Sequence, residues 1–192
     1  MPATQRVLGV DLAITDYERT MDWVDATVRE HGKGYVCVAA THTVVAAVAK
    51  DQRYIDPELA AAVRDASLVV PDGQPVVWAM NAFGAGLRDR VYGPDLMAKH
   101  LERSTRTGVT HFLYGCPTDE LMAELRGRLE ARFPGLRFAG THSPPYRELT
   151  DGELDEIAGI INAAKPDVVW VGVGVPKQEK WMAHMRPLLD AP

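Results

Sequence analysis

Short apolar runs alternate with segments of helical periodicity along almost the whole of this 192-residue chain. A run of this length suits a buried β-strand of about four to eight residues and is too short for a helix of several turns. Strands that alternate with helices form a parallel sheet with both faces covered. We therefore expect an α/β protein with a Rossmann-like, mostly parallel sheet and helices on both faces. The runs lie at residues 6–12, 35–40, 67–71, 110–114, 136–140 and 167–171.

Residues typical of helix starts separate these runs. Thr15 and Glu18 have the spacing of a capping box, in which the two side chains satisfy free amides of the first turn. Asp56 is followed by a proline, a pairing that suits the cap and the first position of a helix. Leucines at positions 121, 125 and 129 predict an apolar stripe on a later helix.

The composition is that of one ordinary globular domain. The length is about that of a single domain, and no repeat or linker divides the chain, so residues 1–192 are expected to fold together. A net charge of −5 argues against general affinity for nucleic acid. No apolar run reaches the roughly 20 residues of a membrane span, and the amino terminus lacks the order of a signal peptide. We expect a cytoplasmic protein.

Asp72 and Gly73 follow the third apolar run, at the edge of the sheet where ligands bind in parallel α/β folds. A carboxylate there can act as a general base if it reaches an acceptor hydroxyl and burial raises its pKa. The alternative is that Asp-Gly simply forms a tight turn.

A glycine-rich segment follows the last apolar run. Gly172 and Gly174 allow a ligand to approach the backbone closely, and a helix that begins near Lys177 would direct its amides at a phosphate. The spacing matches neither a Walker loop nor the dinucleotide-binding fingerprint. A purely structural turn between strand and helix is the alternative.

Three further side chains are candidates for binding or chemistry. Arg90 can stabilise a departing diphosphate, or it can form a solvated pair with Asp89. Tyr146 can stack on a base, or it can only pack. Cys116 can be a nucleophile, although no histidine partner is identifiable and an incidental thiol is the alternative.

No metal site is expected. The chain contains no Asp-x-Asp sequence, and its six histidines and two cysteines show no ligand spacing. If a phosphate group leaves during the reaction, protein groups must therefore stabilise its charge. No cofactor is expected either.

Five blocks of the sequence, taken in order, resemble the WecG/TagA/CpsF family of bacterial glycosyltransferases. The resemblance spans nearly the whole chain, and its strongest part is the Pro-Lys-Gln-Glu block with Asp-Gly upstream. The blocks are Leu68-Val69-Val70-Pro71-Asp72-Gly73, Arg90-Val91-Tyr92-Gly93-Pro94-Asp95-Leu96, Phe112-Leu113-Tyr114-Gly115, Pro134-Gly135-Leu136 and Gly172-Val173-Gly174-Val175-Pro176-Lys177-Gln178-Glu179-Lys180-Trp181.

The resemblance implies inverting, metal-independent transfer of a sugar from a UDP-sugar to a polyprenyl-diphosphate-linked acceptor. The sugar is expected to be N-acetylmannosamine or another hexose or N-acetylhexosamine. The product would serve the synthesis of surface polysaccharide or a teichoic-acid-type polymer. A nucleotide-sugar-binding module without turnover is the alternative.

The same resemblance implies roles for individual residues. Asp72 would be the base, and Arg90 and Gln178 would lie in the donor or acceptor pocket. Tyr146 and the loop at 172–174 would meet the nucleotide. The remaining residues expected at the substrate are Gly115, Lys177, Glu179 and Thr41.

Two departures from the family pattern bear on the acceptor. Ala40 stands where the family usually has asparagine, and Thr41, His42 and Thr43 are the candidates to replace it. Relatives continue beyond the position of Pro192 with a strand and a basic appendage that reaches the membrane. We therefore expect the intact protein to lie at the inner face of the cell membrane, with self-association possible.

Overall fold

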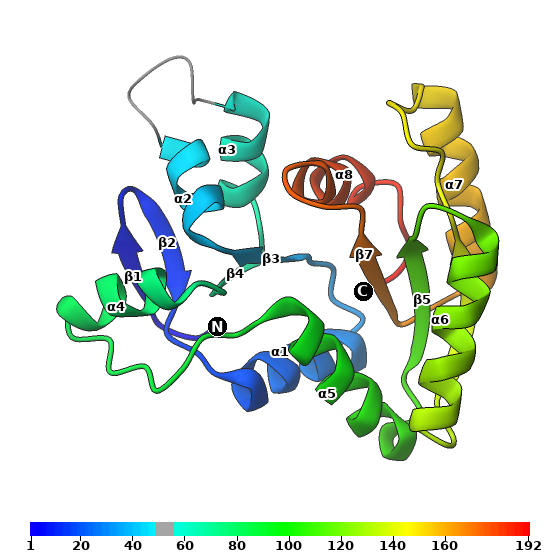
Figure 1. Ribbon diagram of the computed structural model, residues 1–192, viewed down its shortest axis with the longest axis horizontal. Helices are drawn as coiled ribbons and strands as arrows, with labels where there is room; N and C mark the ends of the chain where they lie inside the picture. The colour runs from blue at the N-terminus through cyan, green and yellow to red at the C-terminus, as the bar shows by residue number, and fades with distance from the viewer. Residues whose placement is uncertain (49–55) are drawn as a thin grey trace. The chain divides into compact units, whose positions relative to one another are not determined.

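The computed structural model describes residues 1–48 and 56–192 (Figure 1). The chain divides into two compact units: Met1–Leu96 with Val175–Ala183 form unit 1, and Met97–Gly174 with His184–Pro192 form unit 2. Parallel strands and flanking helices occur in both units, which confirms the α/β class. The expectation of a single domain over residues 1–192 stays a prediction.

Unit 1 begins with a β-hairpin. β1 (Thr4–Val7) pairs antiparallel with β2 (Val10–Ala13), so the prediction of one strand over residues 6–12 was wrong. Leu8 and Gly9 at the turn have φ values of 50° and 92°, the two positive angles that a two-residue type I′ turn uses. Leucine rarely adopts this conformation, and for that reason the sequence contained no clear hairpin signal.

A parallel pair of strands forms the centre of unit 1. β3 (Val36–Ala39) pairs with β4 (Leu68–Pro71), and Ala39 lies opposite Pro71, so both strands end at the same edge. The connection contains α2 (Thr41–Val48) and α3 (Pro57–Arg64). The predicted cap of α3 is confirmed, because Asp56 Oδ1 accepts a hydrogen bond from the amide of Leu59 at 3.0 Å.

The remaining helices of unit 1 are α1 (Tyr17–Arg29), α4 (Gln74–Ala82), the first residues of α5 (Gly93–Thr107) and most of α8 (Lys177–Met185). The cap of α1 is Asp16, whose Oδ1 accepts from the amide of Arg19 at 2.9 Å. The predicted capping box from Thr15 was therefore wrong by one residue. Thr15 instead shares a hydrogen bond of 3.1 Å with the hydroxyl of Thr20.

The core of unit 1 is built from the hairpin, the parallel pair and the helices beside them. Each large apolar side chain buried there contributes about 1.5–3 kcal/mol. This core fixes the ends of β3 and β4, from which the candidate site is built. Its buried members include Leu12, Cys37, Leu59, Val76 and Met80.

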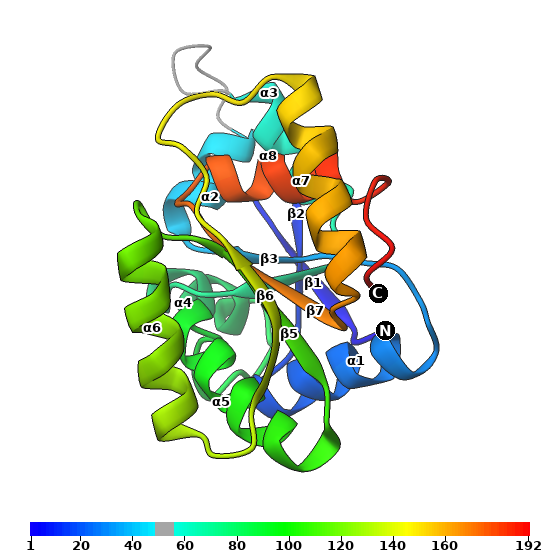
Figure 2. The ribbon, with the colours of Figure 1, turned by 90° about the vertical axis from the view of Figure 1, so that its right-hand side faces the viewer.

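Unit 2 contains a parallel sheet of three strands in the order β6-β5-β7, seen in Figure 2. The strands are β5 (Thr110–Gly115), β6 (Arg137–His142) and β7 (Val168–Gly172). Asp167 Oδ2 accepts from both the amide and the hydroxyl of Thr110, at 2.7 and 2.8 Å, and so joins the starts of β5 and β7.

The helical part of unit 2 comprises the remainder of α5 from Met97 onward, α6 (Asp119–Arg132) and α7 (Asp151–Ala164), with the last residues of α8. The apolar stripe predicted for α6 was wrong, because Leu121 and Leu125 are exposed and the buried residue of this helix is Met122. In the described part of the chain, no helix combines the length and the apolar character needed to cross a bilayer.

Candidate active site

Asp72 follows β4 and lies beside the end of β3. Its amide donates a hydrogen bond of 3.0 Å to the carbonyl oxygen of Ala39, which extends the parallel pairing by one residue. Gly73 then precedes α4, and a Cβ atom at this position would lie 3.3 Å from Thr41 Oγ1. Glycine thus lets the loop after β4 pack closely against the first turn of α2.

The Asp72 carboxyl group is half-buried. Among the described residues, no group donates a hydrogen bond to its buried Oδ1 atom. Burial raises its pKa above the ordinary value, while the positive charges of Arg90 and His42 act in the opposite direction. A carboxylate whose pKa is raised by burial is a stronger base, as general-base catalysis needs.

Arg90 lies on the segment that leads into α5. The amide of the next residue, Val91, donates to the carbonyl oxygen of Pro71 at 2.7 Å, one residue before Asp72. The guanidinium carbon of Arg90 lies 4.7 Å from the centre of the Tyr92 ring, and the Arg90 side chain is exposed. The Asp89 side chain binds the backbone of Arg90, because Asp89 Oδ1 accepts a hydrogen bond from the Arg90 amide at 2.7 Å.

The first turn of α8 contributes Lys177, Gln178 and Glu179 to unit 1. Glu179 is completely buried, and its Oε1 atom accepts from Gln178 Nε2 at 3.1 Å. Its Oε2 atom has no hydrogen-bond partner in the part of the chain that the structure describes. Burial raises the pKa of Glu179, and the charge of His42 opposes this shift.

Two ion pairs connect α8 to α3. Lys180 Nζ lies 2.8 Å from Asp56 Oδ2 and 3.0 Å from Glu58 Oε2. His42 acts electrostatically on both Asp72 and Glu179. The sequence offered His42 only as a substitute for the missing asparagine, and its electrostatic influence on two carboxyl groups was not foreseen. Unit 1 therefore gathers Asp72, Thr41, His42 and Arg90, together with the start of α8.

The other predicted residues belong to unit 2. Gly115 has a φ of 149°, and a Cβ atom there would lie 2.5 Å from the carbonyl oxygen of Gly172. Close approach of β5 to β7 therefore explains the glycine at 115. Gly172 and Gly174 have open space where a side chain would be, and Tyr146 is 92% exposed.

The thiols offer little support for a cysteine mechanism. Burial raises the pKa of Cys37 to about 12, with a further contribution from the charge of Glu179. Cys116 is half-buried and has a φ of 59°. Residues 1–48 and 56–192 contain no group of three or more His, Cys, Asp or Glu side chains that could hold a metal ion.

A half-buried carboxylate at the carboxyl edge of parallel strands, with an exposed arginine that acts on it electrostatically, is typical of α/β enzymes, in which ligands bind beyond the strand ends. The chain belongs to the glycosyl transferase WecG/TagA/CpsF family, whose model matches residues 5–192. It is therefore a glycosyltransferase by family, and the resemblance seen in the sequence is confirmed.

Two curated relatives share the same description, N-acetylglucosaminyldiphosphoundecaprenol N-acetyl-beta-D-mannosaminyltransferase. The protein of Bacillus spizizenii is 27% identical over 185 residues, which cover 96% of this chain and 68% of the relative. That of Staphylococcus aureus strain NCTC 8325 is 29% identical over 180 residues, which cover 93% of this chain and 66% of the relative. The chain thus spans about two thirds of the length of these relatives.

Proposed function

We propose that this protein transfers N-acetylmannosamine, or a related hexose or N-acetylhexosamine, from a UDP-sugar to a polyprenyl-diphosphate-linked acceptor. The family match and the shared description of the two relatives support this proposal. The product would enter a surface polymer. An acceptor with a lipid tail would require the enzyme to work at the inner face of the cell membrane as a peripheral protein.

In the proposed reaction, Asp72 removes the proton from the acceptor hydroxyl as that oxygen attacks the anomeric carbon. The new carbon–oxygen bond forms on the face opposite the diphosphate, and the bond to the diphosphate breaks with both electrons leaving on the nucleotide. A single displacement of this kind inverts the anomeric configuration. The raised pKa and incomplete burial of the Asp72 carboxyl group are the observations that support its role as base.

The charge of the leaving diphosphate would be stabilised by protein groups. Arg90 is exposed and acts on Asp72 electrostatically, so its guanidinium is available to a ligand near that carboxylate. The exposed Lys177 and the positive end of the α8 helix dipole could add to this stabilisation. Preorganised charges of this kind commonly supply a large part of the rate enhancement.

Binding without turnover is the second candidate function, and Ala40 is the observation that favours it. The side chain of Ala40 is a methyl group, which cannot form a hydrogen bond with a substrate, and its carbonyl oxygen already accepts a hydrogen bond from the amide of Val44 at 3.1 Å. An acceptor hydroxyl or diphosphate that depends on an asparagine amide would lack that contact.

A transfer assay separates the two functions. The full-length protein would be incubated with UDP-N-acetylmannosamine and a short polyprenyl-diphosphate-linked N-acetylglucosamine, in the presence of a chelator. Release of UDP together with a disaccharide product is the expected result. Saturable binding of the donor with no product in the intact protein would favour the binding module.

A further inference from the structure

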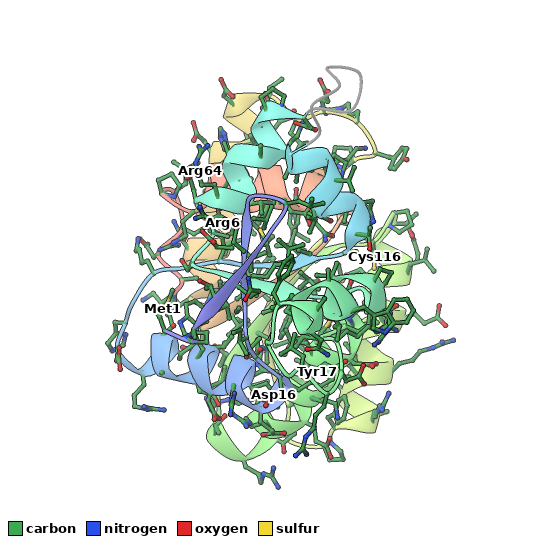
Figure 3. The ribbon with its side chains drawn as sticks, turned by 90° about the vertical axis from the view of Figure 1, so that its left-hand side faces the viewer. Met1, Arg6, Asp16, Tyr17, Arg64 and Cys116 are labelled. Atoms are coloured by element: carbon green, nitrogen blue, oxygen red, sulfur yellow. The ribbon has the colours of Figure 1, made fainter. Side chains whose placement is uncertain are left out.

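Tyr17, the first residue of α1, contacts the segment that carries Arg90. Its hydroxyl oxygen accepts a hydrogen bond from the amide of Tyr92 at 3.1 Å. The same hydroxyl donates to Asp95 Oδ2 over 3.5 Å, a long and therefore weaker contact. Figure 3 labels Tyr17 next to Asp16, the cap of α1.

Tyr92 is the residue before α5, and its carbonyl oxygen already accepts the first helical bond, from the amide of Leu96 at 2.9 Å. An amide in this position has no partner inside the helix and needs one from elsewhere. Tyr17 supplies that partner across 75 positions of the sequence.

The amides on either side of this contact are also fixed. The Arg90 amide donates to Asp89 Oδ1 at 2.7 Å, and the Val91 amide donates to the carbonyl oxygen of Pro71 at 2.7 Å. Three consecutive amides are therefore held: that of Arg90 by the neighbouring Asp89, that of Val91 by β4, and that of Tyr92 by α1. The ring of Tyr92 in turn lies under the Arg90 guanidinium.

The Tyr17 hydroxyl is suited to such a contact. Burial raises its pKa above the ordinary value, and the nearby carboxylates of Asp95 and Asp89 act in the same direction, while the hydrogen bond from Tyr92 opposes them. The hydroxyl thus stays protonated at neutral pH, so it can accept one hydrogen bond and donate another.

We propose that Tyr17 is a positioning residue for the donor site, because its hydroxyl holds the Tyr92 amide and thereby fixes the backbone that presents Arg90 beside Asp72. The proposal rests on the proposed function, in which Arg90 binds the diphosphate of a UDP-sugar. Tyr17 itself touches no reacting atom.

The test is Tyr17→Phe, which removes the hydroxyl and keeps the ring. Loss of one neutral hydrogen bond should raise the KM for the UDP-sugar about three- to tenfold, with kcat reduced less than about twofold. The matched control is Tyr35→Phe, since the Tyr35 hydroxyl is also hydrogen-bonded to the backbone of a different element, in this case donating to the carbonyl oxygen of Ala62 at 2.6 Å. Its KM should stay at the wild-type value.

A double variant shows whether Tyr17 acts through Arg90. In an Arg90→Ala background, Tyr17→Phe should raise KM no further, because the guanidinium it positions is gone. An equal, additive increase in both backgrounds would overturn the proposal.

Hydrogen exchange at the Tyr92 amide tests the contact without any substrate. Tyr17→Phe should make this amide exchange faster by about tenfold or more, whereas Tyr35→Phe should not. Unchanged protection of the Tyr92 amide in Tyr17→Phe would overturn the proposal even if activity fell. If the wild-type protein neither binds nor uses a UDP-sugar, the proposed function fails, and faster exchange would still establish the structural contact.

Discussion

The amide of Asp72 donates to the carbonyl oxygen of Ala39 over 3.0 Å, and this hydrogen bond joins the proposed base to the last residue of β3. Ala40 and Thr41, which follow directly, are therefore fixed next to the loop that carries the carboxylate. The close approach of Thr41 to Gly73 reinforces the arrangement. Substitutions on either strand end should consequently affect the same chemistry.

Asp72→Asn should abolish most transfer and stabilise the protein. Loss of a general base commonly costs about 10²- to 10⁴-fold in rate, and kcat should fall within that range. The folded state raises the pKa of Asp72, so it binds this proton more tightly than the unfolded state. Ionisation of Asp72 therefore lowers the free energy of unfolding as the pH rises above 3.8, the ordinary pKa of an aspartate side chain.

Thermal unfolding at pH 7 measures the second effect, and Tm should be higher for Asp72→Asn than for the wild type. The exposed Asp155→Asn, on α7, is the control and should change neither rate nor Tm appreciably. A fully active Asp72→Asn would rule out its role as base.

Ala40→Asn should improve both the fold and the use of acceptor. Ala40 immediately precedes α2, and asparagine in place of alanine at a helix cap stabilises by about 0.5–2 kcal/mol. Its amide would also restore the group that the family usually has there. We expect a higher kcat/KM for the acceptor and unchanged affinity for the donor, measured by steady-state kinetics and calorimetry.

Ala40→Ser separates the two effects, since serine caps a helix equally well but lacks the amide. A gain in activity with serine equal to that with asparagine would show that stability alone was responsible.

Gly115→Ala should destabilise the protein by about 2 kcal/mol or more, because the added Cβ atom would meet the Gly172 carbonyl oxygen at 2.5 Å and the φ of 149° disfavours a side chain. Gly127→Ala, in α6 with no atom within 4 Å of the added carbon, should instead stabilise by about 0.5–1 kcal/mol. Urea unfolding of both variants checks the opposite signs. Equal changes in the free energy of unfolding would mean that β5 and β7 lie further apart at Gly115 than the structure shows.

Glu179 should make stability depend on pH. Its pKa is raised in the folded state. The free energy of unfolding should therefore fall as the pH rises from 4.5, the ordinary pKa of a glutamate side chain, through the raised pKa of Glu179 in the folded protein. Glu179→Gln removes this titration and should flatten the profile while keeping the size of the side chain. Urea unfolding between pH 4 and 8 measures it, with the exposed Glu148→Gln as control. A profile for Glu179→Gln parallel to that of the wild type would contradict the assignment.

The sequence predicted the alternation of strands and helices because apolar periodicity is a local signal. It also predicted the cap at Asp56, where the structure shows the bonded side chain. The hairpin was missed because Leu8 has a positive φ, a backbone conformation that leucine rarely adopts. The exposed Leu121 and Leu125 were misjudged because periodicity alone does not show which face of a helix meets a sheet.

The candidate site was predictable only in part. The resemblance named Asp72, Arg90 and Gln178, which the structure assigns to unit 1. The contact of Tyr17 with the amide of Tyr92 joins positions far apart in the sequence and leaves no local pattern. The burial of Glu179 likewise depends on tertiary packing, since its neighbours in the sequence are charged or polar.

The most direct test of the account is the anomeric configuration of the transferred sugar. The full-length protein would convert UDP-N-acetylmannosamine and a lipid-diphosphate-linked acceptor in the presence of a chelator, and nuclear magnetic resonance would determine the linkage formed. The account predicts a product of configuration opposite to that of the donor, no loss of rate with the chelator, and transfer by Asp72→Asn slowed about 10²- to 10⁴-fold. Retention of configuration, or a rate that depends on a divalent metal, would contradict it.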